Sequence, residues 1–410
     1  MHRCLKRKML QNITIASIGL ICAAAGPRAA TAFDHPLTAW APRAYVCPRL
    51  DPAPHIDGRL DDPAWAPSPW SDAFVDIRGA DILATDILAT DIQEDLAGPP
   101  RHRTRIRLGW DDDNLYIAAQ LDEPHVQATL TERDAVIYHD NDFEVFIDPD
   151  GDNHLYGELE INALGTVWDL LLVRPYRDGG PAVDAWDIAG LGSAVAIDGT
   201  LNDPGDHDRG WTVELAIPWK VLGQLAGRAC PPAPGDIWRL NFSRVQWRTE
   251  AVDGRYRKVV DPTTGLPLPE DNWVWSPQGL VAMHCPEMWG EVLFDDGSGR
   301  TVASAAEHAR IAMANGLMPL YYRQQALREA GGRLAGTLGR FAGTLAELGV
   351  PAGHWPRWPG EAGPDGATTA PLPAGWALTM DGDSTWFRAT LTTPLGTASI
   401  DHTGKLERTP

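Results

Sequence analysis

Short segments in which apolar and polar residues alternate recur along the chain between about positions 105 and 294. They are bounded by Asp, Asn, Gly or Pro, and no long helical pattern separates them. Alternation of this kind predicts strands with one buried face, and the short spacing predicts a mainly β fold, an antiparallel β-sandwich of the immunoglobulin-like or jelly-roll type. The predicted strands are 105–110, 115–121, 142–148, 158–164, 167–173, 195–197, 211–217, 237–245 and 291–294, and a short helix is predicted at 218–222.

The most regular alternation occurs in 142–148 and 156–162, which an acidic turn joins. Apolar residues alternate with carboxylates in both segments, so the pair predicts a β-hairpin with an apolar core face and a polar outer face. Because successive side chains of a strand point to opposite faces, Glu158, Glu160 and Asn162 share one face. A polar face of this kind can bind sugars or calcium.

The alternation stops after 294, and helical spacing takes its place. Leucines recur at that spacing from Pro319, which suits a helix start, to Gly349, which suits a stop. They predict one long amphipathic helix within a helical extension over 296–350. Several glycines each weaken this helix by about 1 kcal/mol relative to Ala, so it must be stabilised by docking. A Pro/Gly-rich linker and a small β tail are predicted over 351–410, with a hairpin formed by 386–391 and 397–401.

The first 32 residues have the features of a secretory signal peptide. A basic region precedes the apolar stretch 13–25, and the motif that ends at Ala32 has the small-x-small form that signal peptidase recognises. We therefore expect a Sec signal peptide over 1–32, cleavage after Ala32, and a short linker over 33–44. The mature protein is expected to be secreted or periplasmic.

Charge and the lack of further apolar runs limit the expected partners. The 410 residues carry 35 Lys+Arg and 55 Asp+Glu, a formal net charge of −20. Removing the predicted signal peptide takes away five basic residues and no acid, which leaves 30 against 55, a net charge of −25. Such a surface repels phosphate backbones and anionic lipid heads, so neither nucleic acid nor a membrane surface is an expected partner. No other stretch approaches the ~18 apolar residues of a membrane span.

The cysteines say little about function, whereas two missing motifs argue against two kinds of metal chemistry. Cys47, Cys230 and Cys285 remain after removal of the signal peptide, so at most one internal disulfide is expected. The chain has neither a CxxC nor an HExxH motif. A structural zinc site or zincin chemistry needs that close ligand spacing, so neither is expected.

Six blocks of sequence, taken in order, resemble the signature of carbohydrate-binding module family 9. The resemblance covers about residues 45–295. It implies a β-sandwich related to the DOMON group, found in exported proteins and often attached to xylan-degrading enzymes, that binds sugars and carries calcium. It does not imply catalysis. The blocks are 57–65, 110–116, 141–149, 160–162, 210–219 and 289–290.

In this family a sugar lies between two aromatic platforms and is hydrogen-bonded by polar residues of neighbouring strands. The resemblance places the first platform on Tyr138 and the carboxylate on Glu144. It places the further polar residues on Glu158, Glu160 and Asn162. The implied mechanism is stacking on Tyr138 and a tryptophan, with sugar hydroxyls bridged by the polar set. A carboxylate accepts two hydroxyls, which favours vicinal diols.

The position of the second platform falls near His284, where the aromatic residue of the family is missing. A tryptophan elsewhere in the chain, Trp168, Trp247, Trp273 or Trp275, is the expected substitute. The predicted carbohydrate-binding set is therefore Tyr138, Glu144, Glu158, Glu160, Asn162, Trp168, Trp275 and His284.

Calcium ligands are predicted in the turn of the hairpin. Asp148, Asp150 and Asp152 alternate there with Gly151 and Asn153. They offer hard oxygen ligands that converge on one point, as Ca²⁺ requires. The turn is not an EF-hand, because Gly lies at the wrong place and no Glu closes the loop, so a plain acidic turn stays open as the alternative.

Two other functions fit parts of the sequence. Inverting glycosidases need carboxyl groups about 6.5–9.5 Å apart, and Glu158 and Glu160 lie ~7 Å apart as alternate strand positions. They point the same way, however, whereas a hydrolytic pair flanks the bond from opposite sides, so no catalysis is expected. Sandwiches of DOMON type also hold haem through Met and His, which makes Met283 and His284 candidate ligands of a non-covalent electron-transfer haem.

Taken together, the sequence predicts an exported, non-catalytic carbohydrate-binding protein that assists the capture or breakdown of xylan, cellulose or related oligosaccharides. Calcium is the expected cofactor, and the C-terminal helix is a candidate docking site for a protein partner. A haem-binding electron-transfer domain and, with weaker support, a glycoside hydrolase accessory are the alternatives.

Overall fold

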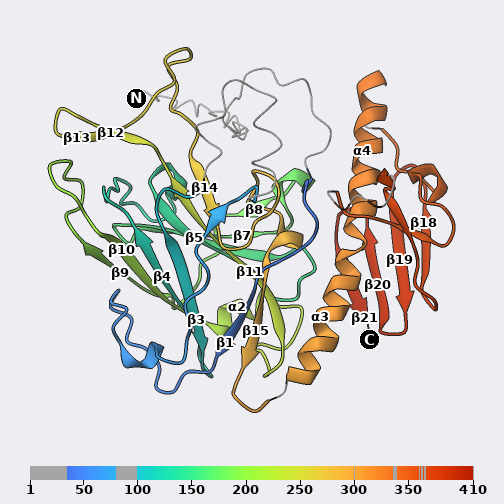
Figure 1. Cartoon of the computed structure of the whole chain (residues 1–410), viewed down its shortest axis with the longest axis horizontal. Coiled ribbons are helices and arrows are strands. Elements are labelled where there is room, and N and C mark those ends of the chain that lie inside the picture. The colour runs from blue at the N-terminus through green and yellow to red at the C-terminus, as the bar shows by residue number, and fades with distance from the viewer. Residues whose placement is uncertain are drawn as a thin grey trace, which may run out of the picture. The chain divides into compact units, whose positions relative to one another are not determined.

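The computed structural model describes residues 35–79, 99–299, 301–335, 339–359, 361, 363 and 366–409. The side chains of 301–304 and 332–335 lie outside this description. The predicted signal peptide and its cleavage position after Ala32 also lie outside the described residues. Strands dominate the described chain and build two facing sheets and a separate C-terminal sheet (Figure 1).

Nine strands of the described chain form the larger of the two facing sheets. Seven follow the order β1-β15-β11-β5-β6-β7-β8, while β14 pairs with β11 and β2 pairs with β14. All of these pairs are antiparallel except β1 with β15, which is parallel. The strands are β1 (Ala44–Pro48), β2 (Val75–Asp76), β5 (Asp142–Asp148), β6 (Tyr156–Asn162), β7 (Val167–Leu172), β8 (Ala182–Val183), β11 (Ile237–Gln246), β14 (Asp271–Val274) and β15 (Gly290–Asp295).

The smaller facing sheet has the order β3-β4-β10-β9 and is antiparallel throughout. The short helix predicted at 218–222 is present as α2 (Trp219–Leu222), directly after β10. A separate hairpin of β12 and β13 leaves the end of β11. The strands are β3 (Thr104–Trp110), β4 (Asn114–Asp122), β9 (Gly192–Asp198), β10 (Gly210–Pro218), β12 (Thr249–Val252) and β13 (Arg255–Lys258).

Apolar side chains from the facing sides of the two sheets form one core. Leu115, Ile117 and Ala119 alternate along β4 and point into it. Phe143 and Val145 do the same along β5, and all five side chains are at most 1% exposed. Burial of apolar area contributes roughly 25 cal/mol per Å², so this alternation drives the two sheets together. The β-sandwich predicted from the sequence is confirmed.

Glu214 on β10 ties the segment before β2 to the smaller sheet. Its carboxylate accepts hydrogen bonds from the backbone N–H groups of Asp57 (3.0 Å) and Gly58 (2.9 Å). It also accepts one from Nε1 of Trp65 (2.7 Å). Gly58 has φ +83°, and a Cβ there would lie 2.7 Å from the backbone of Val195, so only glycine fits. Two of the six family-like blocks therefore hold the fold together through these residues.

The helical extension predicted after the sandwich is present, but it is divided differently from the expectation. It consists of α3 (Thr301–Asn315) and α4 (Met318–Ala335), separated by a short turn (Figure 1). The helix expected from Pro319 to Gly349 ends within a glycine-rich stretch, where helix propensity is lowest. The C-terminal sheet follows in the order β18-β19-β20-β21 and contains the predicted hairpin as β19 and β20. Its strands are β18 (Ala377–Gly382), β19 (Phe387–Thr393), β20 (Gly396–Asp401) and β21 (Leu406–Thr409). A separate antiparallel pair is formed by β16 (His354–Pro356) and β17 (Thr369–Pro371).

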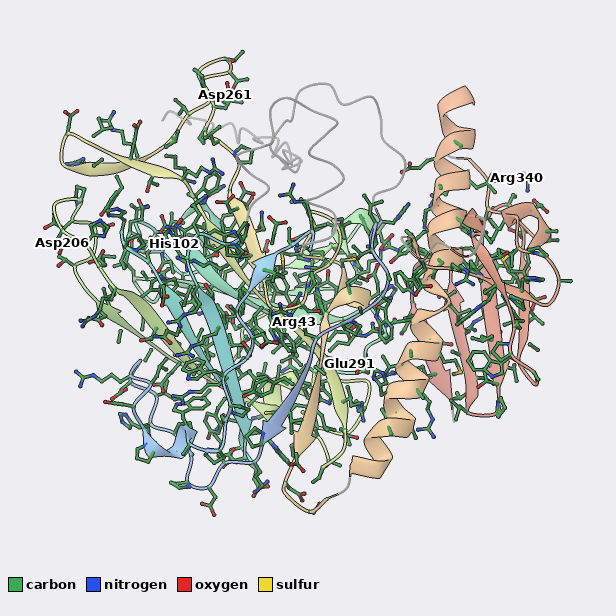
Figure 2. All side chains as sticks on the ribbon, viewed as in Figure 1. Arg43, His102, Asp206, Asp261, Glu291 and Arg340 are labelled. Carbon is green, nitrogen blue, oxygen red and sulfur yellow. The ribbon has the colours of Figure 1, made fainter. Side chains whose placement is uncertain are left out.

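Polar contacts, one of them buried, join α3 to the sandwich. Arg239 on β11 donates hydrogen bonds to Oδ1 of Asn153 (2.7 Å) and Oδ1 of Asn315 (2.6 Å), the latter at the end of α3. Glu291 on β15 lies on the side of the sandwich next to α3, and its Oε2 is 2.6 Å from Nδ1 of His308 (Figure 2). Residues of the sandwich thus dock α3.

A buried ion pair joins α4 to the sandwich. Nη2 of Arg177 lies 2.5 Å from Oε1 of Glu287, and the Tyr322 hydroxyl on α4 donates to the same oxygen at 2.6 Å. Burial alone would raise the pKa of Glu287, but Arg177 and Tyr322 outweigh burial and lower it. Around this pair, α3, α4 and the C-terminal sheet share a second apolar core.

Candidate functional site

A row of cross-strand neighbours runs over the face of the larger sheet that points away from the core. Ser243 on β11 lies opposite Glu144 on β5. Glu144 lies opposite Glu160 on β6, and Glu160 lies opposite Trp168 on β7. Directly opposed residues of antiparallel strands point to the same face, so these four side chains are lateral neighbours.

Four carboxyl groups gather on this face, and we call them the acidic floor. Asp142 and Glu144 belong to β5, and Glu158 and Glu160 belong to β6. Each pair is two residues apart on its strand, which keeps both members on one face. All four side chains are at most 5% exposed.

Burial raises the pKa of every carboxyl group in the acidic floor, and neighbouring acids raise it further. The pKa of Glu144 rises to about 7, chiefly through burial, although the Ser243 hydroxyl lowers it. The pKa values of Asp142, Glu158 and Glu160 lie well above their ordinary range. A protonated carboxyl donates one hydrogen bond and still accepts others, so the floor offers donors as well as acceptors near neutral pH.

Tyr138 lies beside the acidic floor, where two backbone hydrogen bonds hold it. Its N–H donates to Oε2 of Glu160 (2.8 Å), and its carbonyl accepts from Nε1 of Trp247 (2.8 Å). The residue is half-buried, which leaves part of the ring accessible. The structure therefore brings the predicted platform together with three of the predicted carboxylates.

Tyr176 is a second aromatic residue near the acidic floor, in the short 3₁₀ helix that follows β7. It is 36% exposed. Burial raises its pKa, and the charges of Glu158 and Glu160 raise it further, with a smaller contribution from Tyr138. The Tyr176 ring contacts His284, which in turn lies 3.8 Å from Glu158, so Tyr176 is close to one end of the floor.

His284 lies against the floor and is neutral. Its Nδ1 is 3.0 Å from the Tyr156 hydroxyl, and its Nε2 is 3.8 Å from Oε1 of Glu158. Burial, followed by the charge of Arg177, lowers the pKa of His284 to about 3, so the contact with Glu158 is not an ion pair. The ring meets Tyr176 edge-on, with centroids 4.4 Å apart. Because both ring nitrogens face protein groups, the arrangement does not fit an axial ligand of haem.

Three further residues of the predicted binding set are held by packing or hydrogen bonds within the protein. Trp275 is buried in the core between the sheets, where it packs against Phe242. Asn162 is buried, and its amide is fully engaged, since Nδ2 donates to two oxygens and Oδ1 accepts from two backbone N–H groups. Neither is available to a ligand. Trp168 stays on the site face but is half-buried against an apolar cluster that includes Trp289.

The predicted calcium ligands lie in the turn between β5 and β6, where the chain supplies its own cation. Nζ of Lys405 is 3.1 Å from Oδ2 of Asp152. Asp148 is buried and accepts hydrogen bonds from two backbone N–H groups of the turn. Asp150 accepts one from a third backbone N–H. These carboxylates fit an acidic turn closed by an ammonium group better than an open Ca²⁺ site.

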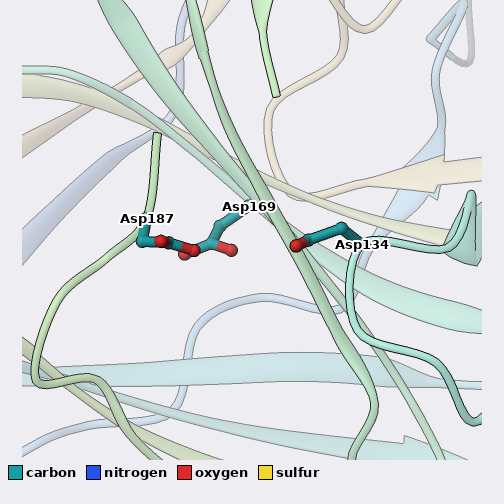
Figure 3. Close-up of side chains that lie close together, drawn as sticks. All are labelled: Asp134, Asp169 and Asp187. Carbon is teal, nitrogen blue, oxygen red and sulfur yellow. The ribbon is translucent and has the colours of Figure 1, made fainter. Parts of the chain in front are cut away.

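A third acidic group consists of Asp134, Asp169 and Asp187 (Figure 3). Arg133 donates hydrogen bonds to Asp169 and, at 3.0 Å, to Asp187. A guanidinium group therefore pairs with this cluster and offsets part of its charge. In contrast, no Lys or Arg of the described chain forms an ion pair with the acidic floor.

Sequence reasoning singled out neither Asp142 nor Tyr176 as a site residue. Asp142 could have been predicted, because the two-residue period that groups Glu158 with Glu160 also groups Asp142 with Glu144. Tyr176 gave no local signal, since its place depends on the path of the chain after β7.

Comparisons with known proteins match the first half of the sandwich to a family. Residues 56–163 match the family described as carbohydrate family 9 binding domain-like, which confirms over those residues the resemblance expected from the sequence. This segment includes Tyr138 and the acidic floor. A search of curated proteins gives no match.

Several solved structures are similar at low identity. Two are of a carbohydrate binding module family 9 from Caldicellulosiruptor kristjanssonii, in complex with cellotriose (17% identity, TM-score 0.38) and with glucose (16%, 0.37). Both matches cover 63% of this chain. They cover 96% of the chain with cellotriose and 98% of the chain with glucose. A protein from Bacteroides uniformis is 14% identical, with a TM-score of 0.43. That match covers 62% of this chain and 100% of the Bacteroides chain. Among the described helices, none combines the length and apolar character needed to cross a bilayer.

Proposed function

We propose that the chain is an exported, non-catalytic carbohydrate-binding protein that holds a sugar against the acidic floor. The observation that carries the proposal is the placement of two partly exposed tyrosines, Tyr138 and Tyr176, next to buried carboxyl groups of two adjacent strands. Sugar rings present apolar C–H faces to aromatic rings and hydroxyl groups to polar atoms. The family match over 56–163 supports the same ligand class.

The carboxyl groups of the floor suit hydroxyl ligands in either protonation state. A charged carboxylate accepts hydrogen bonds from two hydroxyls, whereas a protonated one donates to a hydroxyl oxygen and accepts another bond. Because the pKa of Glu144 is about 7, both forms of this group are populated near neutral pH. Neutral polysaccharide fragments, such as those of xylan or cellulose, therefore fit better than anionic sugars, which buried acids would repel.

Binding without hydrolysis is proposed because of how the carboxyl groups point. Glu158 and Glu160 lie on one strand and on one face of it, so both approach a ligand from the same side. A pair of hydrolytic carboxyls flanks the scissile bond from opposite sides. We expect oligosaccharides to remain intact after long incubation with the protein, as measured by chromatography.

The sugar site is tested by isothermal titration calorimetry with cello-oligosaccharides, xylo-oligosaccharides and glucose. We expect saturable binding that Tyr138→Ala weakens by about ten-fold or more, as loss of a stacked ring does. Trp386→Ala is the matched control, because Trp386 is exposed in the turn between β18 and β19, and it should bind as the wild type does. No heat with any sugar, or equal losses in the two variants, would reject the site.

Export is tested separately, because it rests on the pattern of the first 32 residues alone. The chain, expressed with its own N-terminus in a Gram-negative host, is recovered from the periplasm or the medium and sequenced from its N-terminus. Phe33 as the first residue supports the proposal. A cytoplasmic protein that keeps the basic segment would reject it.

A further inference from the structure

Three carboxyl groups of the acidic floor lie close enough to share one cation, and we call them the floor trio. One oxygen each of Asp142, Glu144 and Glu160 falls within 4.8 Å of the others. Oxygen ligands lie about 2.4 Å from a Ca²⁺ ion, so ligands on opposite sides of it are about 5 Å apart. The trio comes from the central, paired strands β5 and β6, which makes its geometry rigid.

Two buried oxygens of the floor trio have no hydrogen-bond partner among the described residues. They are Oδ2 of Asp142 and Oε2 of Glu144. The other oxygen of Asp142 accepts the backbone N–H of Val245 at 3.2 Å, which fixes the carboxyl group in place. A buried polar atom left unpaired costs about 1–3 kcal/mol, and more when charged. Asp142 and Glu144 therefore each keep one buried oxygen that a bound cation would satisfy.

Each of the other two acidic groups of the described chain is contacted by a basic side chain. Arg133 contacts Asp169 and Asp187, and Lys405 contacts Asp152. The floor trio differs, because no Lys or Arg of the described residues pairs with it. Groups of buried carboxylates are stable only when they are neutralised by protons, by basic side chains or by a metal ion. In the floor trio, a bound metal ion would therefore supply the positive charge that Arg133 and Lys405 supply to the other two groups.

We propose that the floor trio binds one divalent cation of the Ca²⁺ class. Three carboxylates are hard oxygen ligands, and the hydroxyl of Ser243, which lies opposite Glu144, adds another oxygen. Ca²⁺ takes 6–8 oxygens, so the trio leaves positions for water or for two adjacent hydroxyls of a sugar. The cation site stands on the trio alone, whereas the contact with sugar hydroxyls rests on the proposed function.

The site is tested by calorimetric titration of the purified full chain with CaCl₂, after removal of metals with EDTA and dialysis, and with no sugar present. We expect one saturable site whose affinity falls by more than about ten-fold in Glu144→Gln and in Glu160→Gln. Asp150→Asn and Asp187→Asn remove one carboxylate from each of the other acidic groups. These matched controls should keep the affinity of the wild type for this site.

The possible outcomes separate this site from the others. Circular dichroism identifies a variant that has not folded, and the second Gln variant then gives the same readout. Absence of calcium binding in the wild type overturns the proposal, as does unchanged binding in a folded Gln variant. Loss of the site in Asp150→Asn or Asp187→Asn overturns it too. Because the titration contains no sugar, its result is independent of the carbohydrate titration, and either proposal can fail alone.

Discussion

Glu144 on β5 and Glu160 on β6 are direct cross-strand neighbours, and both are buried. Like charges placed opposite each other destabilise a sheet, and burial adds the cost of removing charge from water. The fold carries both of these costs on one face of the larger sheet, and Tyr138 and Tyr176 lie beside that face. Clusters of strongly perturbed acids are more typical of functional sites than of structural surfaces, which favours this face as the place of ligand binding.

The raised pKa of Glu144 predicts how stability changes with pH. Its folded-state pKa is about 7, above its ordinary value, so the folded protein keeps a proton that the unfolded chain has already released. The free energy of unfolding should therefore fall as pH rises from about 5 to about 8. Glu144→Gln should remove up to about 3 kcal/mol of that fall. Urea unfolding in chelator at several pH values measures it.

The matched control for this pH dependence is Glu250→Gln, since Glu250 is exposed on β12. It should show the same pH dependence as the wild type. Equal slopes in the wild type and in Glu144→Gln would contradict a raised pKa at Glu144.

Tyr176 is predicted to act as the second aromatic platform. Tyr176→Ala should weaken sugar binding about ten-fold, because stacking on an aromatic ring is worth about 1 kcal/mol or more. Tyr176→Phe should keep most of the affinity, since it retains the ring and loses the hydroxyl alone. Calorimetry with the best oligosaccharide measures both variants. Equal losses in Ala and Phe would instead assign the effect to the hydroxyl.

Local alternation was sufficient to predict most strands of the sandwich. The span 142–148 is the same in the prediction and in β5, because each residue there obeys the two-residue period. The parallel pairing of β1 with β15 left no local pattern, since its partners are far apart in sequence. The helix α3 was missed because its apolar face is built mainly from alanine rather than from regularly spaced leucine.

The candidate site was predicted in part, for reasons that differ between residues. Glu158 and Glu160 share a face because of strand geometry, which sequence reveals. Asn162 obeys the same period, but it ends β6, and its amide is consumed by the turn that follows. Trp275 was misplaced because aromatic content alone does not say which face of a sheet a residue occupies.

Glu214 is predicted to be a structural residue without a role in binding. Glu214→Ala would leave the buried donors of Gly58 and Trp65 unpaired, together with the partly exposed donor of Asp57, so the free energy of unfolding should fall by about 3 kcal/mol. Chemical denaturation measures this, with Glu250→Ala as an exposed control that should change little. Sugar affinity measured well below the unfolding midpoint should match the wild type, and a selective loss of affinity would contradict the assignment.

The ion pair of Arg177 with Glu287 is predicted to anchor α4. Arg177→Met leaves a carboxylate buried beside Tyr322, which should lower the free energy of unfolding by about 3–5 kcal/mol. Replacing both partners with Met should be less harmful than Arg177→Met, because Glu287 is then not left as a buried charge, while Asp178 loses the same guanidinium in both variants. Arg340→Met, which breaks an exposed pair, is the control and should change stability by less than about 1 kcal/mol.

The ion pair of Arg177 with Glu287 also predicts how stability depends on pH. The folded-state pKa of Glu287 is lowered, so its contribution is present above the unfolded pKa and is lost as pH falls through the folded one. Arg177→Met should remove this part of the acid sensitivity. Equal acid sensitivity in the wild type and in the variant would show that other carboxylates dominate.

Lys405 is predicted to occupy the place that a calcium ion would take at the acidic turn. Its ammonium group lies 3.1 Å from Asp152, and the charge of Asp152 raises the pKa of Lys405. Lys405→Met leaves Asp148, Asp150 and Asp152 without this cation. Since the pair is partly exposed, the loss of stability in chelator should be about 1 kcal/mol or less.

Calcium should then restore the midpoint of thermal unfolding in the Lys405→Met variant by binding the freed carboxylates. The measurement is made in the Glu144→Gln background, so that the proposed cation site at the floor trio does not contribute. Arg388→Met is the control, because it breaks an exposed ion pair on the same C-terminal sheet and should gain nothing from calcium. If Lys405→Met and Arg388→Met respond alike, the turn does not bind calcium even when it is open, and the acidic residues there serve only to hold the C-terminal sheet against the sandwich.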